Sequence, residues 1–546
     1  MTALITGMTE CNSPYEVVAL ASDVFPNNDA IHIPDNSCTS YSKKQITLTY
    51  RELIQRIDLV SAAWEENLVE GPVALILENR VDFFIHWLGL NKLGSCVVPI
   101  SAELQDEEIR YQLEHSNIRT LLCLEEHLER LSLISAKLAA PVPCLSTETL
   151  TPQDASVVKE PKLISLDHEC AILYTSGSTG KPKGCILSND YFIQQGVWYA
   201  SQGGYMSLRR GRERLLTPLP LTHMNAMAVS SMAMFMTGGC LIQIDRFHPS
   251  SWWDTVRVSQ ATALHYLGVL PAMLLSMPAD ARDNFSGQVR FGFGAGVNPI
   301  HHAPFEDRFG FPLVEAWAMT ESGAGGVIAA NEEPRHVGTS CFGRPTALVE
   351  WDIVDELGCS VPAGVAGELR VRSASADASK GFFTGYLNDV EATKEVWRDG
   401  WLNTGDVARA DSDGSLYFVD RLKNIIRRSG ENISAVEVES TIAAHSLVRL
   451  AVAIAVPDEI RGDEVAVCVV LEDQEAACLN TAQLIYHFAA ARLAYYKTPG
   501  WLIFSDTLPV TASQKPMRSK IKQIANSAVN SGHAFDLRKW KSKRRR

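Results

Sequence analysis

The chain has 546 residues, 46% of them hydrophobic, and this length predicts two to four structural units with large buried cores. The formal net charge is −13, although the last nine residues, RKWKSKRRR, carry seven positive charges. Without these seven, 43 basic residues face 63 acidic ones, a balance that disfavours a nucleic-acid partner. We expect the basic tail itself to be a disordered, solvated end.

The sequence does not indicate a membrane protein, and it does not indicate a fold held together by metal ions or disulfide bonds. The start of the chain lacks a basic region followed by an apolar stretch, and no run approaches the ~18 apolar residues of a membrane span. We therefore expect a cytoplasmic enzyme without integral membrane association. Twelve cysteines are scattered singly, with no Cys-x-x-Cys pair, and we expect them to be reduced and mostly packed.

The first 340 residues alternate between β-rich apolar runs and amphipathic segments. Residues 72–77, 96–100 and 119–124 (PVALIL, CVVPI and RTLLCL) predict strands. Residues 81–94 and 106–116 predict amphipathic helices between and after them. This alternation is typical of an α/β sheet.

The pattern of apolar and turn-forming residues changes twice in the rest of the chain. After residue 340, short runs with frequent Gly and Pro predict a small β-rich unit. A further αβ pattern begins near Asn424, with helices predicted at 435–445 and 481–494 and strands at 450–458 and 464–472. The sequence therefore predicts an α/β fold with a large N-terminal domain of α/β sheets plus a small β-rich subdomain, followed by an α+β C-terminal domain; the predicted domains are residues 1–422 and 424–546.

The segment YTSGSTGKPKGC, residues 174–185, combines three glycines, two lysines and four serine or threonine hydroxyls. Such a composition suits a phosphate, because glycine lets backbone N–H groups approach an oxyanion and the other side chains add donors and charge. It is not a Walker A loop, since Thr175 stands at the first glycine and Pro182 follows Lys181. On composition alone, a solvated turn explains the segment equally well.

The residues that follow place this loop between two strands. Pro182 cannot lie within the first turns of a helix, and GCILSN at 184–189 is typical of a short strand. A helix is predicted over 191–200, with Asn189 or Asp190 as its cap.

Four more motifs lie far apart in the chain: EAWAMTES at 315–322, WLNTGDVA at 401–408, FVDRLKNIIRRSGENIS at 418–434 and LPVTASQKPMRSKI at 508–521. Together with the glycine-rich loop, and in this order, they resemble the ANL superfamily of adenylate-forming enzymes. That superfamily includes acyl-CoA synthetases, carrier-loading adenylation domains and firefly-type luciferases. Within the superfamily, the sequence most resembles the carnitine or crotonobetaine CoA ligases.

The resemblance implies a two-step reaction that uses ATP, Mg²⁺ and CoA. A carboxylate attacks the α-phosphate of ATP to give acyl-AMP and pyrophosphate, and the thiol of CoA then displaces AMP. The resemblance also implies that the small C-terminal domain is mobile and rotates about the hinge residue Lys423 between the two half-reactions.

The resemblance assigns the nucleotide to several motifs at once. Thr320 contacts phosphate, and Glu321 holds Mg²⁺, which prefers oxygen ligands. Trp317 stacks on adenine, and Asp406 binds the ribose hydroxyls with Arg421 as its partner. The complete set expected to bind the nucleotide is Thr175, Ser176, Gly177, Ser178, Thr179, Gly180, Lys181, Lys183, Gly294, Ala295, Trp317, Asp406 and Arg421.

The C-terminal motifs carry the roles that change between the two steps. Lys515 matches the adenylation lysine that bridges the carboxylate and the α-phosphate, although Gln514 replaces the glycine usual before it. Ser429, Gly430 and Glu431 are expected at the CoA tunnel, where a residue without Cβ lets pantetheine pass beside the backbone. The expected catalytic set is Lys515, Thr320, Glu321 and His223.

The acyl pocket is expected around PLPLTHMNAMAV, with His223 closing over the carboxylate. Its predicted lining is Trp198, His223, Met227 and Ala318. Ala318 adds a methyl group where the family has glycine, so we expect a narrower pocket. The segment 215–244 contains no Asp or Glu to pair a substrate amine, which argues against an α-amino acid. Its five methionines at 224–236 are more typical of plain core.

Two other interpretations stay open at this point. The chain could be a stand-alone adenylation enzyme that loads a carrier protein, in which case that protein is a partner in place of CoA. It could also be a non-catalytic nucleotide-binding relic of the fold. Against the relic stands the joint presence of Thr320, Glu321, Asp406, Arg421 and Lys515.

Overall fold

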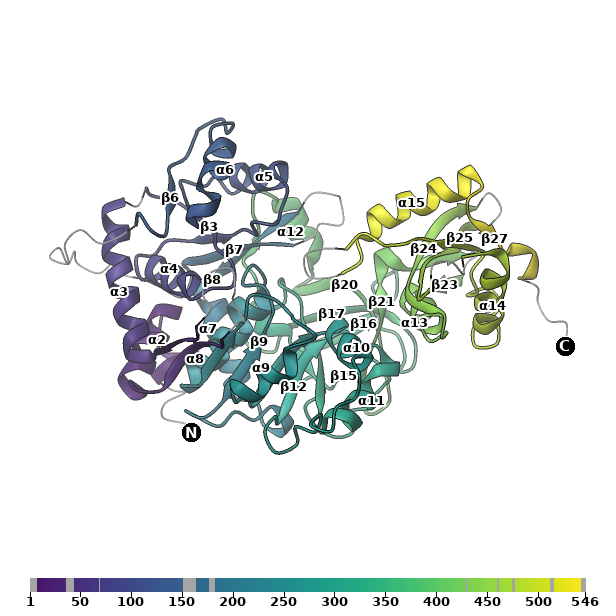
Figure 1. The fold of residues 1–546 in the computed structure, drawn as a ribbon, viewed down its shortest axis with the longest axis horizontal. Coiled ribbons are helices and arrows are strands. Elements are labelled where there is room, and N and C mark those ends of the chain that lie inside the picture. The colour runs from purple at the N-terminus through teal and green to yellow at the C-terminus, as the bar shows by residue number, and fades with distance from the viewer. Residues whose placement is uncertain are drawn as a thin grey trace.

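A computed structural model provides the structure of the chain; it describes residues 7–35, 44–67, 69–150, 164–175, 182–428, 431–458, 461–473, 477–510 and 515–541. A large N-terminal part and a smaller C-terminal lobe, yellow-green in Figure 1, stand beside each other. Strands β20 and β21 lie at their junction (Figure 1). Among the helices in these ranges, none is long and apolar enough to cross a membrane.

One sheet of the N-terminal part has seven strands in the order β18-β8-β7-β4-β3-β5-β6. Strands β3, β4, β5, β6 and β7 run parallel, whereas β8 pairs antiparallel with β7. The predicted strands at 72–77, 96–100 and 119–124 are confirmed as β3, β4 and β5. The bounds are β3 (Val73–Ile76), β4 (Val97–Pro99), β5 (Thr120–Cys123), β6 (Cys144–Ser146), β7 (Glu169–Thr175), β8 (Lys183–Ser188) and β18 (Gly385–Tyr386).

A second sheet has eight strands in the order β14-β13-β12-β11-β9-β10-β1-β2. Its central strands are parallel, and β2 and β14 close the two edges in the antiparallel sense. The bounds are β1 (Asp29–Ile33), β2 (Ile46–Thr49), β9 (Arg214–Thr217), β10 (Cys240–Gln243), β11 (Ala263–Leu267), β12 (Phe291–Ala295), β13 (Leu313–Trp317) and β14 (Ile328–Ala329).

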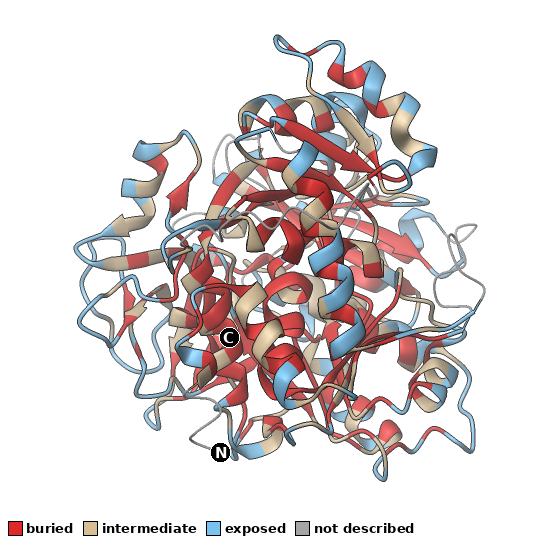
Figure 2. Cartoon of the chain, turned by 90° about the vertical axis from the view of Figure 1, so that its left-hand side faces the viewer, coloured by how far each residue is buried: buried red, intermediate tan, exposed pale blue. Residues whose placement is uncertain are grey.

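Helices pack between and around these two sheets. They are α2 (Pro14–Val24), α3 (Tyr50–Asn67), α4 (Val81–Lys92), α5 (Asp106–His115), α6 (Glu125–Ser135), α7 (Asn189–Ala200), α8 (Ser231–Thr237), α9 (Trp252–Val258), α10 (Val269–Ser276) and α11 (Pro299–Phe309). Helix α4 was predicted to be amphipathic, but it is buried on nearly every side. The reason is its position, since Trp87 packs against Phe192 of α7 and Phe84 against Phe235 of α8. Figure 2 shows buried residues concentrated in the middle of the molecule and exposed ones toward its outside.

The predicted small β-rich unit is confirmed as a sheet with the order β15-β21-β20-β17-β16, in which every pairing is antiparallel. Strand β19 also pairs with β20, and helix α12 lies beside it. The bounds are β15 (Cys341–Gly343), β16 (Val349–Val354), β17 (Gly367–Ser373), α12 (Val390–Val396), β19 (Trp397–Arg398), β20 (Trp401–Ala410) and β21 (Leu416–Arg421).

The described residues of the C-terminal lobe form a six-stranded sheet and three α-helices. Its order is β23-β22-β25-β26-β27, with β24 on the other side of β25. The helices predicted at 435–445 and 481–494 and the strands at 450–458 and 464–472 are confirmed. The bounds are β22 (Ile426–Arg428), β23 (Glu431–Ile433), α13 (Ala435–Ala443), β24 (Val448–Asp458), β25 (Gly462–Leu471), α14 (Leu479–Ala490), β26 (Trp501–Phe504), α15 (Arg518–Ser531) and β27 (Phe535–Asp536).

Two local predictions were wrong. The cap of α7 is Ser188, whose hydroxyl accepts from the Tyr191 N–H, while Asn189 points inward and donates to the Ser165 carbonyl. The start of the basic tail is not a solvated end, because Lys541 is buried and its Nζ lies 2.6 Å from Glu464 Oε1. The charge pattern of the sequence does not show that Lys541 forms an ion pair with a buried carboxylate.

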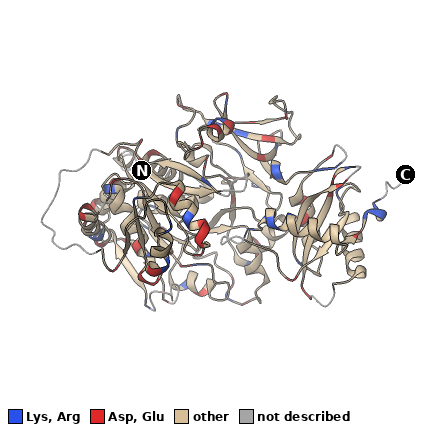
Figure 3. Ribbon diagram, turned by 90° about the horizontal axis from the view of Figure 1, so that it is seen from above, with Lys and Arg blue, Asp and Glu red and all other residues tan. Residues whose placement is uncertain are grey.

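The cysteine prediction agrees with the described residues. All eleven described cysteines are free thiols, and only Cys359 and Cys478 are exposed. Figure 3 shows Lys and Arg residues interspersed with Asp and Glu over both parts of the chain, rather than gathered in one basic stripe in that view.

Candidate active site

The glycine-rich loop connects two paired strands, as the sequence predicts. Thr175 ends β7 and faces Lys183 at the start of β8 across an antiparallel pair. The other predicted phosphate-binding residues of this loop lie outside the described residues; they are Ser176, Gly177, Ser178, Thr179, Gly180 and Lys181.

At the end of this hairpin, Lys183 lies close to the predicted magnesium ligand. The Lys183 Nζ is 4.8 Å from the centroid of the Tyr386 ring and 3.9 Å from Asp389 Oδ2. The Tyr386 hydroxyl in turn donates to Glu321 Oε1 at 2.8 Å. Burial and the neighbouring Glu321 carboxylate raise the pKa of Tyr386, so this hydroxyl keeps its proton and acts as a donor. The arrangement brings a loop cation and a buried carboxylate, 6% exposed, to one place.

Thr320 immediately precedes Glu321 and is held by the helix opposite. Its backbone carbonyl accepts a hydrogen bond from the Tyr191 hydroxyl of α7 at 3.0 Å. A side chain on Gly323 would collide with the same Tyr191 ring and with the Gly381 carbonyl. The turn after β13 therefore packs tightly against α7, which fixes the Thr-Glu pair in position.

Three motifs meet at Asp406, which is 4% exposed. Trp317 Nε1 donates to Asp406 Oδ2 at 2.9 Å, and Arg421 Nε lies 3.1 Å from Asp406 Oδ1. Burial raises the pKa of Asp406, against the opposing effects of Arg421 and of the Trp317 hydrogen bond. Each carboxylate oxygen still has a further acceptor site, which two ribose hydroxyls can use.

Gly294 and Ala295, at the end of β12, are followed by a turn that a buried carboxylate holds. Glu315 of the adjacent strand β13 accepts hydrogen bonds from the backbone N–H groups of Gly296 and Val297, the latter at 3.1 Å. A Cβ on Gly294 would collide with the Tyr266 carbonyl. Burial raises the pKa of Glu315 to about 7. Sequence reasoning missed Glu315, whose only signal is one acidic residue inside the apolar strand LVEAW.

The C-terminal lobe brings Lys515 to this site. Lys515 lies within electrostatic reach of Arg421 and Asp406, and its pKa is lowered by burial and by the Arg421 charge. It also acts on His223, whose pKa is lowered to about 4, chiefly by burial and additionally by the Lys515 ammonium. The His223 residue is nevertheless exposed to solvent. Because of its lowered pKa, the imidazole is neutral at pH 7.

The predicted acyl-pocket residues fall into two groups. Ala318 is exposed directly after β13, and Trp198 of α7 is 6% exposed with an indole N–H that has no partner among the described residues. Met227 is completely buried, so the structure gives no support for its place in the pocket lining. All five methionines at 224–236 are buried, as the core interpretation predicts. Met227 lies in a π-helical turn over Asn225–Ser230, a local form that is frequent at functional sites, and the last three methionines lie in α8.

The predicted hinge lies in a short 3₁₀ turn between the two parts of the chain. Lys423 belongs to Leu422–Asn424, which separates β21 from β22. Burial and the Arg421 charge lower the pKa of Lys423, partly offset by the carboxylates of Asp406 and Glu321. Of the predicted CoA-tunnel residues, Glu431 is exposed at the start of β23, while Ser429 and Gly430 lie outside the described residues.

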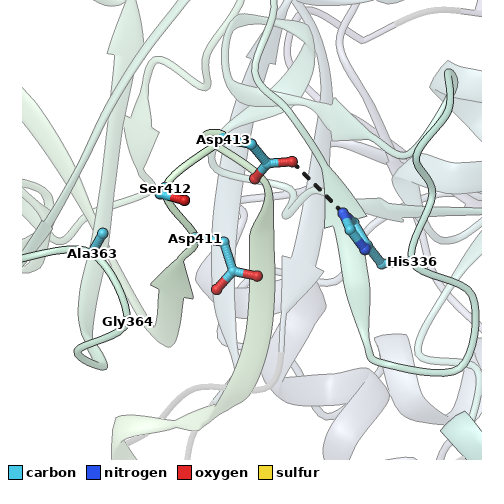
Figure 4. Close-up of a pocket in the computed structure, with 6 residues that line it drawn as sticks. All are labelled: His336, Ala363, Gly364, Asp411, Ser412 and Asp413. Carbon is cyan, nitrogen blue, oxygen red and sulfur yellow. Dashed lines mark ion pairs between the residues drawn. The ribbon is translucent and has the colours of Figure 1, made fainter.

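A cavity of about 400 Å³ opens elsewhere on the small β-rich sheet. Figure 4 shows its lining residues, with His336 Nε2 directed at Asp413 Oδ2 over 3.7 Å. None of the predicted site residues lines it, so it is separate from the site described above.

Comparison with known proteins agrees with this geometry. Residues 24–387 match the family model of the AMP-binding enzymes, and residues 437–515 match the model of the AMP-binding enzyme C-terminal domain. The crotonobetaine/carnitine–CoA ligase of Citrobacter koseri is 31% identical over 82% of this chain and 88% of its own length.

Solved structures share the fold. The crystal structure of ATP-bound MatB from Rhodopseudomonas palustris has a TM-score of 0.79 at 23% identity, over 94% of this chain and 99% of that one. The anthranilate CoA ligase AuaEII in complex with anthranoyl-AMP has a TM-score of 0.81 at 22% identity, over 95% and 98%. The chain therefore belongs to the AMP-binding enzyme family, and it is a ligase of the adenylate-forming type that its motifs predict.

Proposed function

We propose that this protein is an ATP-dependent acyl-CoA ligase that forms acyl-AMP from a carboxylic acid and then the CoA thioester. The observation that carries the proposal is that Lys515 of the C-terminal lobe lies within electrostatic range of Asp406, Arg421 and His223 of the N-terminal part. A protein that only binds nucleotide does not need a lysine of the C-terminal lobe beside the nucleotide site. The CoA ligase relatives support CoA as the acceptor.

In the first half-reaction the chain positions three groups around the α-phosphate. Asp406 and Arg421 hold the ribose, while Trp317 and the Gly294–Ala295 backbone flank the adenine. The glycine-rich loop, Lys183 and Thr320 bind the outgoing pyrophosphate. The Lys515 ammonium lies between the attacking carboxylate and the α-phosphate, where negative charge gathers in the transition state.

His223 closes the carboxylate side of the site as a neutral imidazole, which can donate one hydrogen bond without competing for the Lys515 charge. Trp198 and Ala318 border the acyl group. Because no acidic side chain lies between 215 and 244, we propose an acid without an α-amino group to pair.

Magnesium fits the residues at Glu321. The Glu321 carboxylate is a hard oxygen donor of the kind that magnesium prefers, and the Tyr386 hydroxyl donates to its Oε1. A magnesium ion bound there would neutralise phosphate charge during the displacement. Tyr386 keeps the Glu321 carboxylate in one orientation for that purpose.

In the second half-reaction the C-terminal lobe turns about Lys423 and replaces Lys515 at the site with Ser429, Gly430 and Glu431. The thiol of CoA then displaces AMP from the acyl-AMP. Since ATP and CoA are both substrates of the metabolic interior, we propose a cytoplasmic enzyme.

The test is a panel of carboxylic acids supplied with ATP, Mg²⁺ and CoA, followed by pyrophosphate release and by mass spectrometry of the thioester. The proposal predicts pyrophosphate release and a CoA thioester with at least one acid class. Pyrophosphate release without a thioester, with acyl transfer only to a phosphopantetheinylated protein, identifies a carrier-loading enzyme. ATP binding without turnover of any acid identifies a relic.

A further inference from the structure

Asp420 joins the two parts of the chain through a buried carboxylate. It lies in β21, at the end of the N-terminal part, and it is completely buried. Its Oδ2 accepts hydrogen bonds from the Ser434 hydroxyl and from the Val436 N–H, each at 3.0 Å. Both donors lie at the start of α13 in the C-terminal lobe.

The two oxygens of this carboxylate have different partners. Oδ1 accepts from the Arg421 N–H at 2.7 Å, which lies before the predicted hinge, and from Asn424 Nδ2 at 3.3 Å, which lies directly after it. The Arg421 bond holds the side chain in place from its own side of the junction. Oδ2 is left for the C-terminal lobe alone, and Asp420 thus acts as an external cap for α13, where a negative charge is favoured by the helix dipole.

The predicted hinge Lys423 lies between the partners of this contact. Asp420 precedes the hinge by three residues, and Ser434 follows it by eleven. A large rotation at Lys423 cannot keep both Oδ2 bonds. The contact therefore exists in the orientation that brings Lys515 to Asp406, and it is lost in any strongly rotated one. Another contact across the junction is the ion pair of Arg427 with Glu356 at 2.9 Å. Both side chains are exposed, so this pair contributes little to the stability of the lobe orientation.

We propose that Asp420 is a positioning residue for the adenylation half-reaction: by capping α13 across the junction it stabilises the lobe orientation in which Lys515 serves the site. This inference rests on the proposed function. Because buried hydrogen bonds to a charged group are the strong ones, their loss shifts the balance between the two lobe orientations toward the rotated one.

The test is Asp420→Asn, which keeps the size of the side chain but presents an amide NH₂ or an uncharged oxygen to the two donors. Adenylation is measured by pyrophosphate exchange, and thioester formation by supplying acyl-AMP and CoA. If the two orientations exchange rapidly, the ratio of the second rate to the first equals their population ratio times a constant. We expect that ratio to rise about tenfold in Asp420→Asn.

Ser434→Ala removes one of the two donors and serves as the milder variant if Asp420→Asn folds poorly. It should move the ratio in the same direction by about threefold. Matched controls lie inside the N-terminal part: Asp283→Asn removes a buried carboxylate paired with Arg308, and Ser13→Ala removes the cap of α2. Both controls should leave the ratio unchanged even where they lower the melting temperature.

An unchanged ratio in Asp420→Asn and Ser434→Ala, with melting temperatures like those of the controls, overturns the proposal. Equal loss of both half-reactions also overturns it, because that result describes a merely structural carboxylate. If the wild-type protein itself turns over no acid, the proposed function fails, and that failure is seen before any variant is compared.

Discussion

Asp406 and Arg421 face each other across the paired strands β20 and β21, with Arg421 Nε 3.1 Å from Asp406 Oδ1. Trp317, from a different sheet, donates to the other oxygen of the same carboxylate. Asp406, which is expected to bind ribose, is thus already aligned by two neighbours, and one of them, Trp317, belongs to the same motif as Glu321.

Replacing Asp406 by Asn should weaken ATP binding and leave the fold intact. The amide offers one acceptor oxygen in place of two, so the pair of ribose hydroxyls loses a partner, and we expect the KM for ATP in pyrophosphate exchange to rise at least about tenfold. Asp413→Asn, in the turn between β20 and β21 that lines the separate surface cavity, is the control and should leave the KM for ATP unchanged. An unchanged KM in Asp406→Asn would remove Asp406 from the nucleotide site.

Lys515→Ala should slow adenylation far more than thioester formation. Loss of one positioned charge donor typically costs about 10²- to 10³-fold in rate, and Lys515 is expected to leave the site before the thiol attacks. The two halves are assayed separately, with pyrophosphate exchange for the first and supplied acyl-AMP plus CoA for the second. Lys520→Ala, which changes an exposed lysine in the first turn of α15, is the control. Equal losses in both halves would show that Lys515 has no role confined to the first.

The fold was largely predictable because its signals are local. Alternating apolar runs predict β3, β4 and β5, and Pro182 predicts that the glycine-rich loop joins two strands. The environment of α4 was not predictable, since its burial depends on α7 and α8, which pack onto it from distant parts of the chain. The motif residues were found through spacing and resemblance.

The residues that support the site gave almost no sequence signal. Tyr386 orients Glu321 from 65 positions away, and Asp420 carries two contacts that depend on how the lobes meet. Lys541 looked like part of a solvated run, although a buried carboxylate pairs it. Such partners become visible only when the chain is folded, because their roles are set by burial and not by pattern.

Ala318→Gly should widen the range of acids that the protein accepts. Ala318 is exposed directly after β13 and carries a methyl group where the family pattern has a glycine. We expect kcat/KM to rise severalfold for the bulkiest members of a graded acid series and to change little for the smallest. Ala363→Gly in the separate cavity is the control. An unaltered size profile would show that position 318 does not face the acid.

Glu315→Gln should change how stability depends on pH. Burial raises the pKa of Glu315 from 4.5 to about 7, so the folded protein keeps a proton that the unfolded chain has lost between these pH values. Wild-type stability should therefore fall relative to the variant as pH rises from 4.5 to 7, by about 3 kcal/mol at most, and then stay level. Melting temperatures of both proteins across pH 4 to 8 check this. Parallel curves would mean that Glu315 ionises in the fold as it does in water.

The most direct test of the central claim follows the oxygen atoms. An acid that supports pyrophosphate exchange is supplied with both carboxylate oxygens as ¹⁸O, together with ATP, Mg²⁺ and CoA, and the AMP product is analysed by mass spectrometry. Attack of the carboxylate on the α-phosphate, followed by displacement with the thiol, predicts one ¹⁸O atom in each AMP and one in the thioester. Unlabelled AMP, or release of ADP and phosphate, would contradict an acyl-AMP intermediate and with it the proposed function.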